Sequence, residues 1–149
     1  MTDTALTHVL LIEDNPADAR LITEYFAEQS WPNIDADAPT VDHVGRLSEA
    51  RDALTEEVDV ILLDLGLPDS SGVETLDEVL SIDIPAPVVV MTGLNDERVG
   101  VDAVERGAQD YLVKDDVTPR SLQQTLRYAI RREQQERELR QRNAELSLL

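Results

Sequence analysis

The sequence contains no cysteine, a single lysine and few aromatic residues, which make up 3% of the chain. Without cysteine, a disulfide framework, a thiolate zinc site, an iron–sulfur cluster and a cysteine nucleophile are excluded. No apolar run exceeds four residues, whereas about 20 are needed to cross a bilayer. The first residues also lack the basic start of a signal peptide. We therefore expect a cytoplasmic protein that has no contact with a membrane.

Acidic residues dominate the charge. Asp and Glu number 31 against 13 Lys and Arg, which gives a net charge of −18. A nucleic-acid backbone would be repelled by most of this surface, so no nucleic-acid partner is expected. The balance changes at Pro119, because residues 119–149 carry seven Arg against four Glu. The strong excess of acidic residues and the single lysine predict a source in a halophilic archaeon. The high salt concentration inside such a cell screens the repulsion between like charges. An ordinary acidic protein is the alternative.

The length of 149 residues suits one domain with a single core and leaves no room for a second folded output module. Extended and helical patterns alternate along it. We expect strands at 8–12, 40–44, 58–63, 88–91 and 111–113, each followed by a helix, the last a long one from Pro119. Asn15 and Pro16 suit the cap and first position of the first helix. The alternation predicts a doubly wound α/β fold with a five-stranded parallel sheet and helices on both faces.

The helices are expected to bury one apolar stripe each. Loops are predicted at 31–39 and 65–72. The stripes are Leu21, Ile22, Tyr25 and Phe26; then Leu47, Ala50 and Leu54; then Val73, Leu76, Val79 and Leu80; and finally Leu122, Leu126, Ala129 and Ile130.

Polar residues stand where the predicted strands end, at the edge where doubly wound sheets bind ligands. They are Glu13 and Asp14 after the first strand, Asp64 after the third, Thr92 and Gly93 after the fourth, and Lys114 after the fifth. Three neighbouring carboxylates raise one another's pKa unless a counter-charge is present. Mg²⁺ supplies such a charge and prefers oxygen ligands, including phosphate oxygens. The pattern therefore predicts a magnesium site that receives a phosphoryl group.

Each of these residues has an expected role at that site. Asp64 is the candidate nucleophile, which would form an aspartyl phosphate. The Lys114 ammonium would pair with one phosphoryl oxygen, and the Thr92 hydroxyl and the Gly93 N–H would hold another. Any one of the acids alone would more often be a solvated loop charge. The two histidines, His8 and His43, are expected to be structural or exposed and away from this cluster.

Four segments in order resemble the receiver domain of two-component response regulators, the CheY-like fold. The resemblance covers about residues 8–132, leaving a tail at 1–7 and a C-terminal helical extension at 133–149. The segments are Leu11-Ile12-Glu13-Asp14-Asn15, Leu63-Asp64-Leu65-Gly66-Leu67-Pro68-Asp69 with Gly72 beyond it, Met91-Thr92-Gly93, and Gly107-Ala108-Gln109-Asp110-Tyr111-Leu112-Val113-Lys114. The chain departs from many receivers after the lysine, where two aspartates replace the usual proline.

The resemblance implies that Asp64 accepts a phosphoryl group from a phosphohistidine on a sensor histidine kinase or a histidine phosphotransfer protein. It implies that Asp14, Asp64 and the backbone carbonyl of Gly66 bind Mg²⁺ directly, with Glu13 acting mostly through water. Thr92 and Lys114 would contact the phosphoryl group.

Switching would move an aromatic side chain. The resemblance implies that Tyr111 swings inward when Thr92 moves, while a simple packing role is the alternative. Such a protein is not an enzyme beyond its own phosphorylation and dephosphorylation, and it would signal to a downstream protein through contacts.

Two other functions compete. The first is a receiver-like binding module that takes no phosphate, which the complete set of acids, hydroxyl and ammonium argues against. The second is a phosphatase of the haloacid dehalogenase type, which usually needs a second Asp two residues after the nucleophile as general acid. Position 66 is Gly, so this activity is not expected.

The C-terminal extension is rich in Arg, Glu and Gln and favours helix. Leu139 and Leu146 are seven residues apart, which gives a thin apolar seam. Beyond Arg131 the helix is not expected to bury itself on its own domain. A homodimer seam, a link to a further domain and a solvated tail all remain open.

Overall fold

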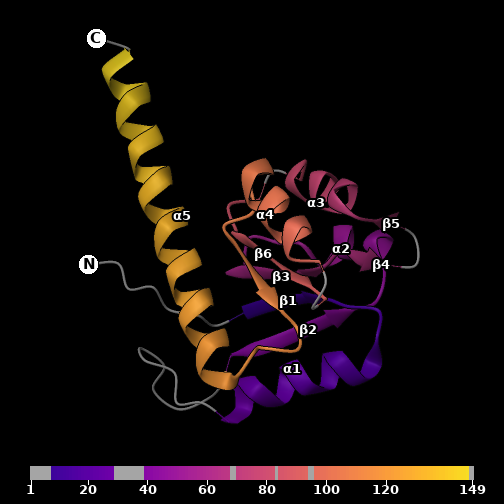
Figure 1. Ribbon diagram of the computed structural model, residues 1–149. Coiled ribbons are helices and arrows are strands. Elements are labelled where there is room, and N and C mark those ends of the chain that lie inside the picture. The colour runs from indigo at the N-terminus through magenta and orange to yellow at the C-terminus, as the bar shows by residue number, and fades with distance from the viewer. Residues whose placement is uncertain (1–7, 29–38, 68–69, 83, 94–95, 148–149) are drawn as a thin grey trace.

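The computed structural model describes residues 8–28, 39–67, 70–82, 84–93 and 96–147. The tail at 1–7, Leu148, Leu149 and most of the loop predicted at 31–39 lie outside these residues. Strands and helices alternate (Figure 1). They are β1 His8–Ile12, α1 Pro16–Glu28, β2 Thr40–Val44, α2 Leu47–Ala53, β3 Val60–Asp64, β4 Gly66–Leu67, β5 Ser70–Ser71, α3 Val73–Leu80, β6 Val88–Thr92, α4 Glu97–Arg106, β7 Asp110–Val113 and α5 Pro119–Ser147.

Five strands form one parallel sheet in the order β2-β1-β3-β6-β7, which confirms the predicted doubly wound fold. The chain changes winding direction between β1 and β3. Register aligns the ends of the three central strands, because Ile12 of β1 lies opposite Leu63 of β3, and Asp64 of β3 lies opposite Met91 of β6. In sheets of this kind ligands bind outside the carboxyl ends of the strands at the switch point.

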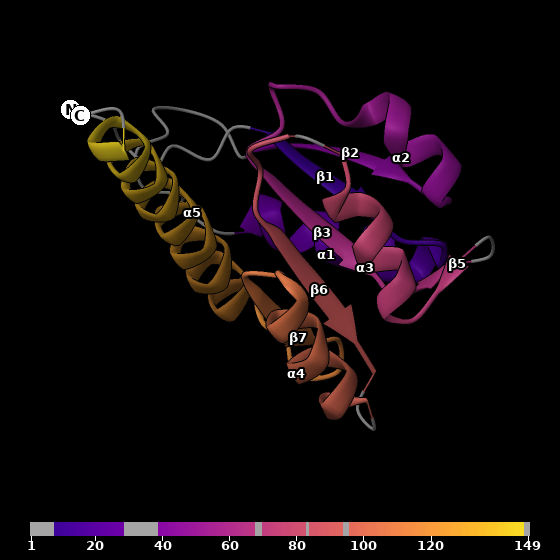
Figure 2. The ribbon, with the colours of Figure 1, turned by 90° about the horizontal axis from the view of Figure 1, so that it is seen from above.

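Helices cover both faces of the sheet, and alternate strand residues serve the two layers. Val9 and Leu11 of β1 pack with α1 and α5, whereas Leu10 and Ile12 pack with α2, α3 and α4. Figures 1 and 2 show these two groups of helices on opposite sides of the sheet. The rigid sandwich holds the strand ends in fixed relative positions.

The predicted stripes of α2 and α5 are buried as expected, but those of α1 and α3 are narrower. On α1, Ile22 and Phe26 are buried while Leu21 is 43% exposed. Adjacent helical residues point about 100° apart, so a narrow contact face can bury Ile22 and leave Leu21 on its exposed border. On α3, Leu80 is likewise exposed.

The loop predicted at 65–72 contains a small antiparallel hairpin, β4 with β5. Gly66 pairs with Ser71, and the Gly72 N–H donates to the carbonyl of Leu65 at 2.8 Å. Gly72 has φ +69°, which a residue without Cβ adopts without strain. Two-residue strands leave no periodic pattern, which explains why the sequence did not predict them.

Helix α5 runs unbroken from Pro119 to Ser147, across the predicted boundary at 132, and its C-terminal end projects past the body (Figure 1). As expected, no described residue beyond Arg131 is buried, although polar contacts with the domain continue as far as Arg137, which donates to the Pro85 carbonyl. Gln109 Nε2 also donates to Glu136 at 3.0 Å. Among the described helices, none combines the length and hydrophobicity needed to cross a membrane.

Candidate functional site

Strand β1 delivers the first acidic residue, Glu13, into the interior, where its side chain has no exposed surface. The Glu13 N–H donates to the Val44 carbonyl at 2.9 Å, which continues the pairing of β1 with β2. His43 Nε2 lies 2.6 Å from the Glu13 carbonyl oxygen, to which an N–H on that nitrogen donates. The prediction that neither histidine lies near the cluster is therefore wrong for His43.

The next segment turns into α1 by the predicted cap. Asn15 Oδ1 accepts hydrogen bonds from the N–H groups of Ala17 at 2.9 Å and Asp18 at 3.3 Å, and Pro16 is the first helical residue. The Asn15 N–H donates to Glu13 Oε2 at 3.2 Å. This turn orients Glu13 and sets Asp18 at the edge of the site.

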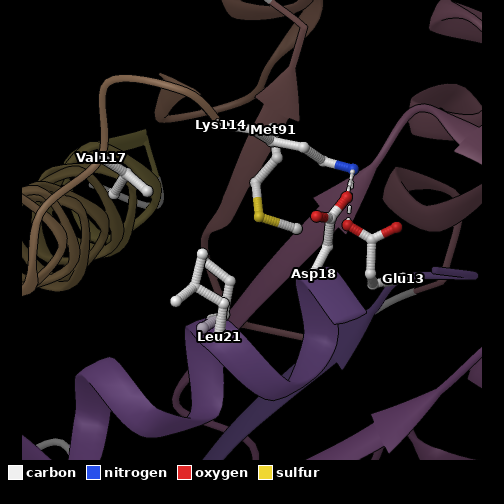
Figure 3. A pocket seen from close by; sticks show the side chains of 7 residues that line it. Glu13, Asp18, Leu21, Met91, Lys114 and Val117 are labelled. Carbon is white, nitrogen blue, oxygen red and sulfur yellow. Dashed lines mark hydrogen bonds and ion pairs between the residues drawn. The ribbon is translucent and has the colours of Figure 1, made fainter. Parts of the chain in front are cut away.

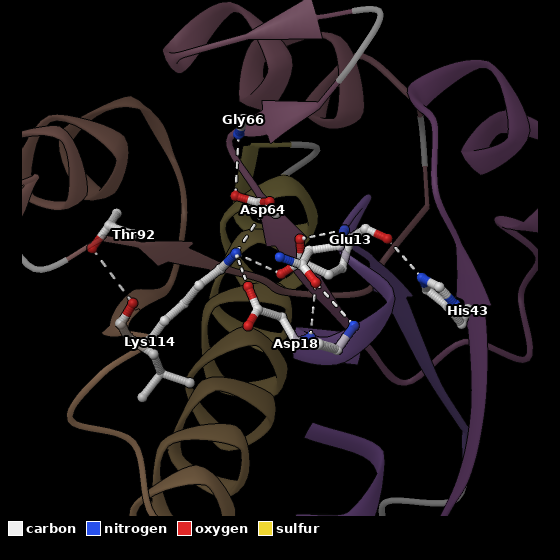
Figure 4. A network of polar contacts seen from close by, with 10 residues as sticks. Glu13, Asp18, His43, Asp64, Gly66, Thr92 and Lys114 are labelled. Carbon is white, nitrogen blue, oxygen red and sulfur yellow. Dashed lines mark hydrogen bonds and ion pairs between the residues drawn. The ribbon is translucent and has the colours of Figure 1, made fainter. Parts of the chain in front are cut away.

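The ammonium of Lys114 lies at the centre of the acidic groups (Figure 4). Its Nζ is 2.6 Å from Glu13 Oε1, 3.1 Å from Asp18 Oδ2 and 3.2 Å from Asp64 Oδ2. The Lys114 N–H donates to the Thr92 carbonyl at 2.9 Å, which anchors the base of the side chain beside β6. In Figure 3 the side chain extends past Met91 toward the acids. The predicted meeting of residues 64 and 114 is confirmed.

The environment shifts the pKa of three groups in different directions. Burial raises the pKa of Glu13 to about 8, helped by a hydrogen bond with Asp64. Burial alone would also raise the pKa of Asp64, but hydrogen bonds from Glu13 and the Gly66 N–H, and the charge of Lys114, bring it below its usual value. Burial acts to lower the pKa of Lys114, yet its hydrogen bond with Glu13 and the nearby carboxylates raise it. Asp64 is thus the ionised carboxylate beside a firmly charged ammonium.

One group of carboxylates has the spacing of a metal site. Glu13, Asp14 and Asp64 each offer an oxygen, and these oxygens lie within 4.8 Å of one another. Glu13 Oε1 is buried and accepts no hydrogen bond of good geometry among the described residues, although it forms the ion pair with Lys114. Carboxylate oxygens at this spacing fit a hard divalent cation.

A cleft of about 280 Å³ opens on the other side of Asp64, and Gly66, Thr92 and Gly93 line it. The Gly66 N–H donates to Asp64 Oδ1 at 3.1 Å, and the other oxygen faces Lys114. The Thr92 hydroxyl is buried and donates to the Leu112 carbonyl at 3.5 Å, a long hydrogen bond that costs little to exchange. Thr92 and Gly93 therefore line the same cleft as Asp64, and Lys114 contacts the Asp64 carboxylate at Oδ2.

Tyr111 lies on β7 with its ring half-buried against α4. A Cβ at Gly100 would lie 2.5 Å from Tyr111 Cδ2, so the ring occupies the space that any larger residue at 100 would need. The predicted inward swing stays a prediction, because it requires a second conformation.

Asp18 is the site residue that the sequence did not single out. It stands five residues after Glu13 and belongs to a helix. A search for polar residues at the ends of predicted strands therefore does not find it. The available signal was the Asn-Pro pair at 15–16, which fixes the first turn of α1 and therefore the side of the helix on which Asp18 lies.

Comparison with known families agrees with this geometry. The model of the response regulator receiver domain matches residues 9–127, which contain every acid of the cluster, Thr92 and Lys114. The chain belongs to the response regulator receiver domain family. The sequence resemblance to that family is thereby confirmed.

Several curated proteins share this receiver domain. The chain is 31% identical over 125 residues to the nitrate/nitrite response regulator protein NarL of Escherichia coli, covering 81% of this chain and 53% of that protein. It is 32% identical over 128 residues to the KDP operon transcriptional regulatory protein KdpE of E. coli, covering 85% and 52%. The chain spans about half the length of such regulators.

Solved structures share the receiver fold. The signal receiver domain of a LuxO repressor protein from Vibrio parahaemolyticus is 26% identical, with a TM-score of 0.72 over 91% of this chain and 98% of that chain. A receiver domain from Clostridium thermocellum is also 26% identical, with a TM-score of 0.71 over 87% and 98%.

Proposed function

We propose that this receiver accepts a phosphoryl group on Asp64 from a phosphohistidine of a sensor histidine kinase or a histidine phosphotransfer protein. It then passes the signal to a downstream protein through contacts between surfaces. The observation that carries the proposal is the position of Asp64. Its carboxylate is ionised and partly buried, one oxygen faces Lys114 at 3.2 Å, and a cleft opens beside it.

The donor set fits Mg²⁺. Three carboxylates converge within 4.8 Å, and oxygen ligands at this spacing are those that Mg²⁺ prefers. Asp14 and Asp64 would hold the ion with the Gly66 carbonyl, and Glu13 would act through water. When bound, Mg²⁺ supplies positive charge that offsets the repulsion between carboxylate and incoming phosphoryl oxygens.

The transfer step needs few groups from the protein. An Asp64 oxygen attacks phosphorus, the P–O bond forms as the P–N bond breaks, and the histidine nitrogen leaves with the electron pair and takes up a proton. Lys114 pairs with a phosphoryl oxygen, while the Thr92 hydroxyl and the Gly93 N–H hold another. The protein supports its own phosphorylation and dephosphorylation and turns over no other substrate.

Phosphorylation would then bias a two-state equilibrium of the receiver. Thr92 leaves its long hydrogen bond to Leu112 for the phosphoryl group, and Tyr111 on the neighbouring strand follows. The alternative is a receiver that binds its partner without being phosphorylated. The lowered pKa of Asp64 beside Lys114 favours signalling through phosphorylation, because it keeps the acceptor carboxylate ionised.

The test uses beryllofluoride, which mimics the phosphoryl group on an aspartate. Binding is measured calorimetrically with Mg²⁺ or with EDTA, for the wild type and for Asp64→Asn. We expect binding by the wild type that requires Mg²⁺ and no binding by the variant. Equal responses of the two proteins would favour the receiver that takes no phosphate.

The acidic, lysine-poor composition further leads us to propose adaptation to molar salt, as in a halophilic archaeon. At 1 M salt charges are screened over about 3 Å, so repulsion within an acidic surface is small. Circular dichroism should report loss of folded signal when the protein is diluted from molar salt into low salt. A signal indifferent to salt would make this an ordinary acidic protein.

A further inference from the structure

Helix α1 brings to the site a carboxylate that the proposed phosphoryl chemistry does not use. Asp18 Oδ2 lies 3.1 Å from Lys114 Nζ, and Figure 3 shows the Asp18 and Glu13 side chains side by side at the ammonium. The Asp18 backbone is fixed by the hydrogen bond from its N–H to Asn15 Oδ1. The contact is thus built into the capped first turn of α1.

The ammonium has three N–H donors and three carboxylate neighbours. Glu13, Asp18 and Asp64 all lie within 3.2 Å of it. A phosphoryl group on Asp64 brings additional oxygens that need a share of the same donors. One of the existing contacts must therefore weaken when the site holds a phosphoryl group.

Exposure decides which contact yields. The Glu13 side chain is 0% exposed and the Asp64 side chain 12%, whereas that of Asp18 is 39% exposed. Water can replace the ammonium at Asp18 but not at buried Glu13, where loss of the counter-charge costs most. As long as the contact with Asp18 persists, it directs one N–H donor of the Lys114 ammonium away from Asp64.

We propose that Asp18 is a positioning residue that restrains the Lys114 ammonium and thereby weakens the hold of the site on a phosphoryl group. The inference rests on the proposed function and names a residue that sets its balance. Two effects act in the same direction. Asp18 competes for Lys114, and its negative charge also repels the oxygens of the phosphoryl group.

The test measures two dissociation constants by calorimetry, that of Mg²⁺ alone and that of beryllofluoride in saturating Mg²⁺. The variants are Asp18→Asn and Asp18→Ala, which both remove the carboxylate. The matched control is Glu24→Gln, which removes one acidic charge from the exposed side of the same helix. Urea unfolding of each variant checks that it is folded.

Both Asp18 variants should bind beryllofluoride about three- to tenfold more tightly than the wild type, a range reduced by solvent screening. Their Mg²⁺ affinity should be equal or lower, because a negative charge has been removed. A purely structural role of Asp18 would weaken both affinities. Glu24→Gln should change neither.

Three results would overturn the inference while leaving the proposed function intact. They are unchanged beryllofluoride affinity in the Asp18 variants, weakening of both affinities, and equal tightening by Glu24→Gln. Absence of Mg²⁺-dependent beryllofluoride binding in the wild type would instead overturn the proposed function, and the inference with it.

Discussion

The two edges of the sheet handle charge in opposite ways. At the carboxyl edge, three carboxylates share the single ammonium of Lys114. At the amino edge, polar groups of α5 have matched partners, because Gln109 donates to Glu136 and Arg137 to the Pro85 carbonyl. In the proposed function, the unbalanced negative charge at the carboxyl edge serves a cation and a phosphoryl group, whereas the matched polar contacts at the amino edge hold α5 on the body.

The largest expected effect comes from removing the shared ammonium. In EDTA, Lys114→Met should lower the free energy of unfolding by about 2–4 kcal/mol, because buried carboxylates lose their counter-charge. Mg²⁺ should restore part of this loss. Urea unfolding with and without Mg²⁺ measures both. A variant as stable as the wild type in EDTA would show that the carboxylates at the carboxyl edge do not depend on the counter-charge of Lys114.

The pH dependence of metal binding tests the same imbalance. Because the pKa of Glu13 is raised to about 8, Mg²⁺ must compete with a proton on the acidic cluster below that pH. The Mg²⁺ dissociation constant should rise by up to about tenfold per pH unit as the pH falls from 8 to 6. Calorimetry at several pH values measures it, and Glu13→Gln should flatten the profile. A flat wild-type profile would contradict the raised pKa.

The titration of Glu13 should also affect the stability of the metal-free protein, but stability should fall with rising pH whereas Mg²⁺ affinity should increase. A carboxyl whose folded pKa exceeds its unfolded value stabilises the fold below the unfolded pKa, and this stability is lost as the pH rises through the folded pKa. For Glu13 this pH window runs from the ordinary glutamate pKa of 4.5 to about 8. Unfolding in EDTA should therefore become easier as the pH approaches 8, and Mg²⁺ should offset the change.

A smaller effect is expected at the contact between β7 and α4. Gly100→Ala would place a Cβ 2.5 Å from the Tyr111 ring, so the ring or the helix must shift. We expect a loss of about 1–2 kcal/mol despite the better helix propensity of Ala. Gly45→Ala is the control, because its Cβ would meet nothing closer than 3.8 Å. Equal stability of the two variants in urea would argue against the tight contact.

The smallest effect is expected at the amino edge. Arg137→Ala should cost less than about 1 kcal/mol, because its contacts are polar and partly exposed. The loss should be the same with Mg²⁺ and with EDTA, and amide exchange should speed up only in the last turns of α5. Coupling of this variant to Mg²⁺ would break the contrast between the two edges.

The sequence predicted those site residues that stand at the ends of apolar strands. Asp64, Thr92 and Lys114 follow apolar strands, and parallel pairing brings strand ends together, so their meeting needed no three-dimensional knowledge. Asp18 and the contact of His43 with the Glu13 carbonyl were missed, since they depend on the rotation of α1 and the register of β2. Adjacent residues such as Leu21 and Ile22 also divide between surface and core in a way that composition does not reveal.

The most direct measurement treats the protein with a small phosphodonor in Mg²⁺, follows the intact mass and maps the modified residue by peptide analysis after borohydride reduction. We expect one phosphoryl group, on Asp64, that requires Mg²⁺ and is absent from Asp64→Asn. Modification of another residue, or none in the folded wild type, would contradict the central claim that this carboxylate is the phosphoryl acceptor.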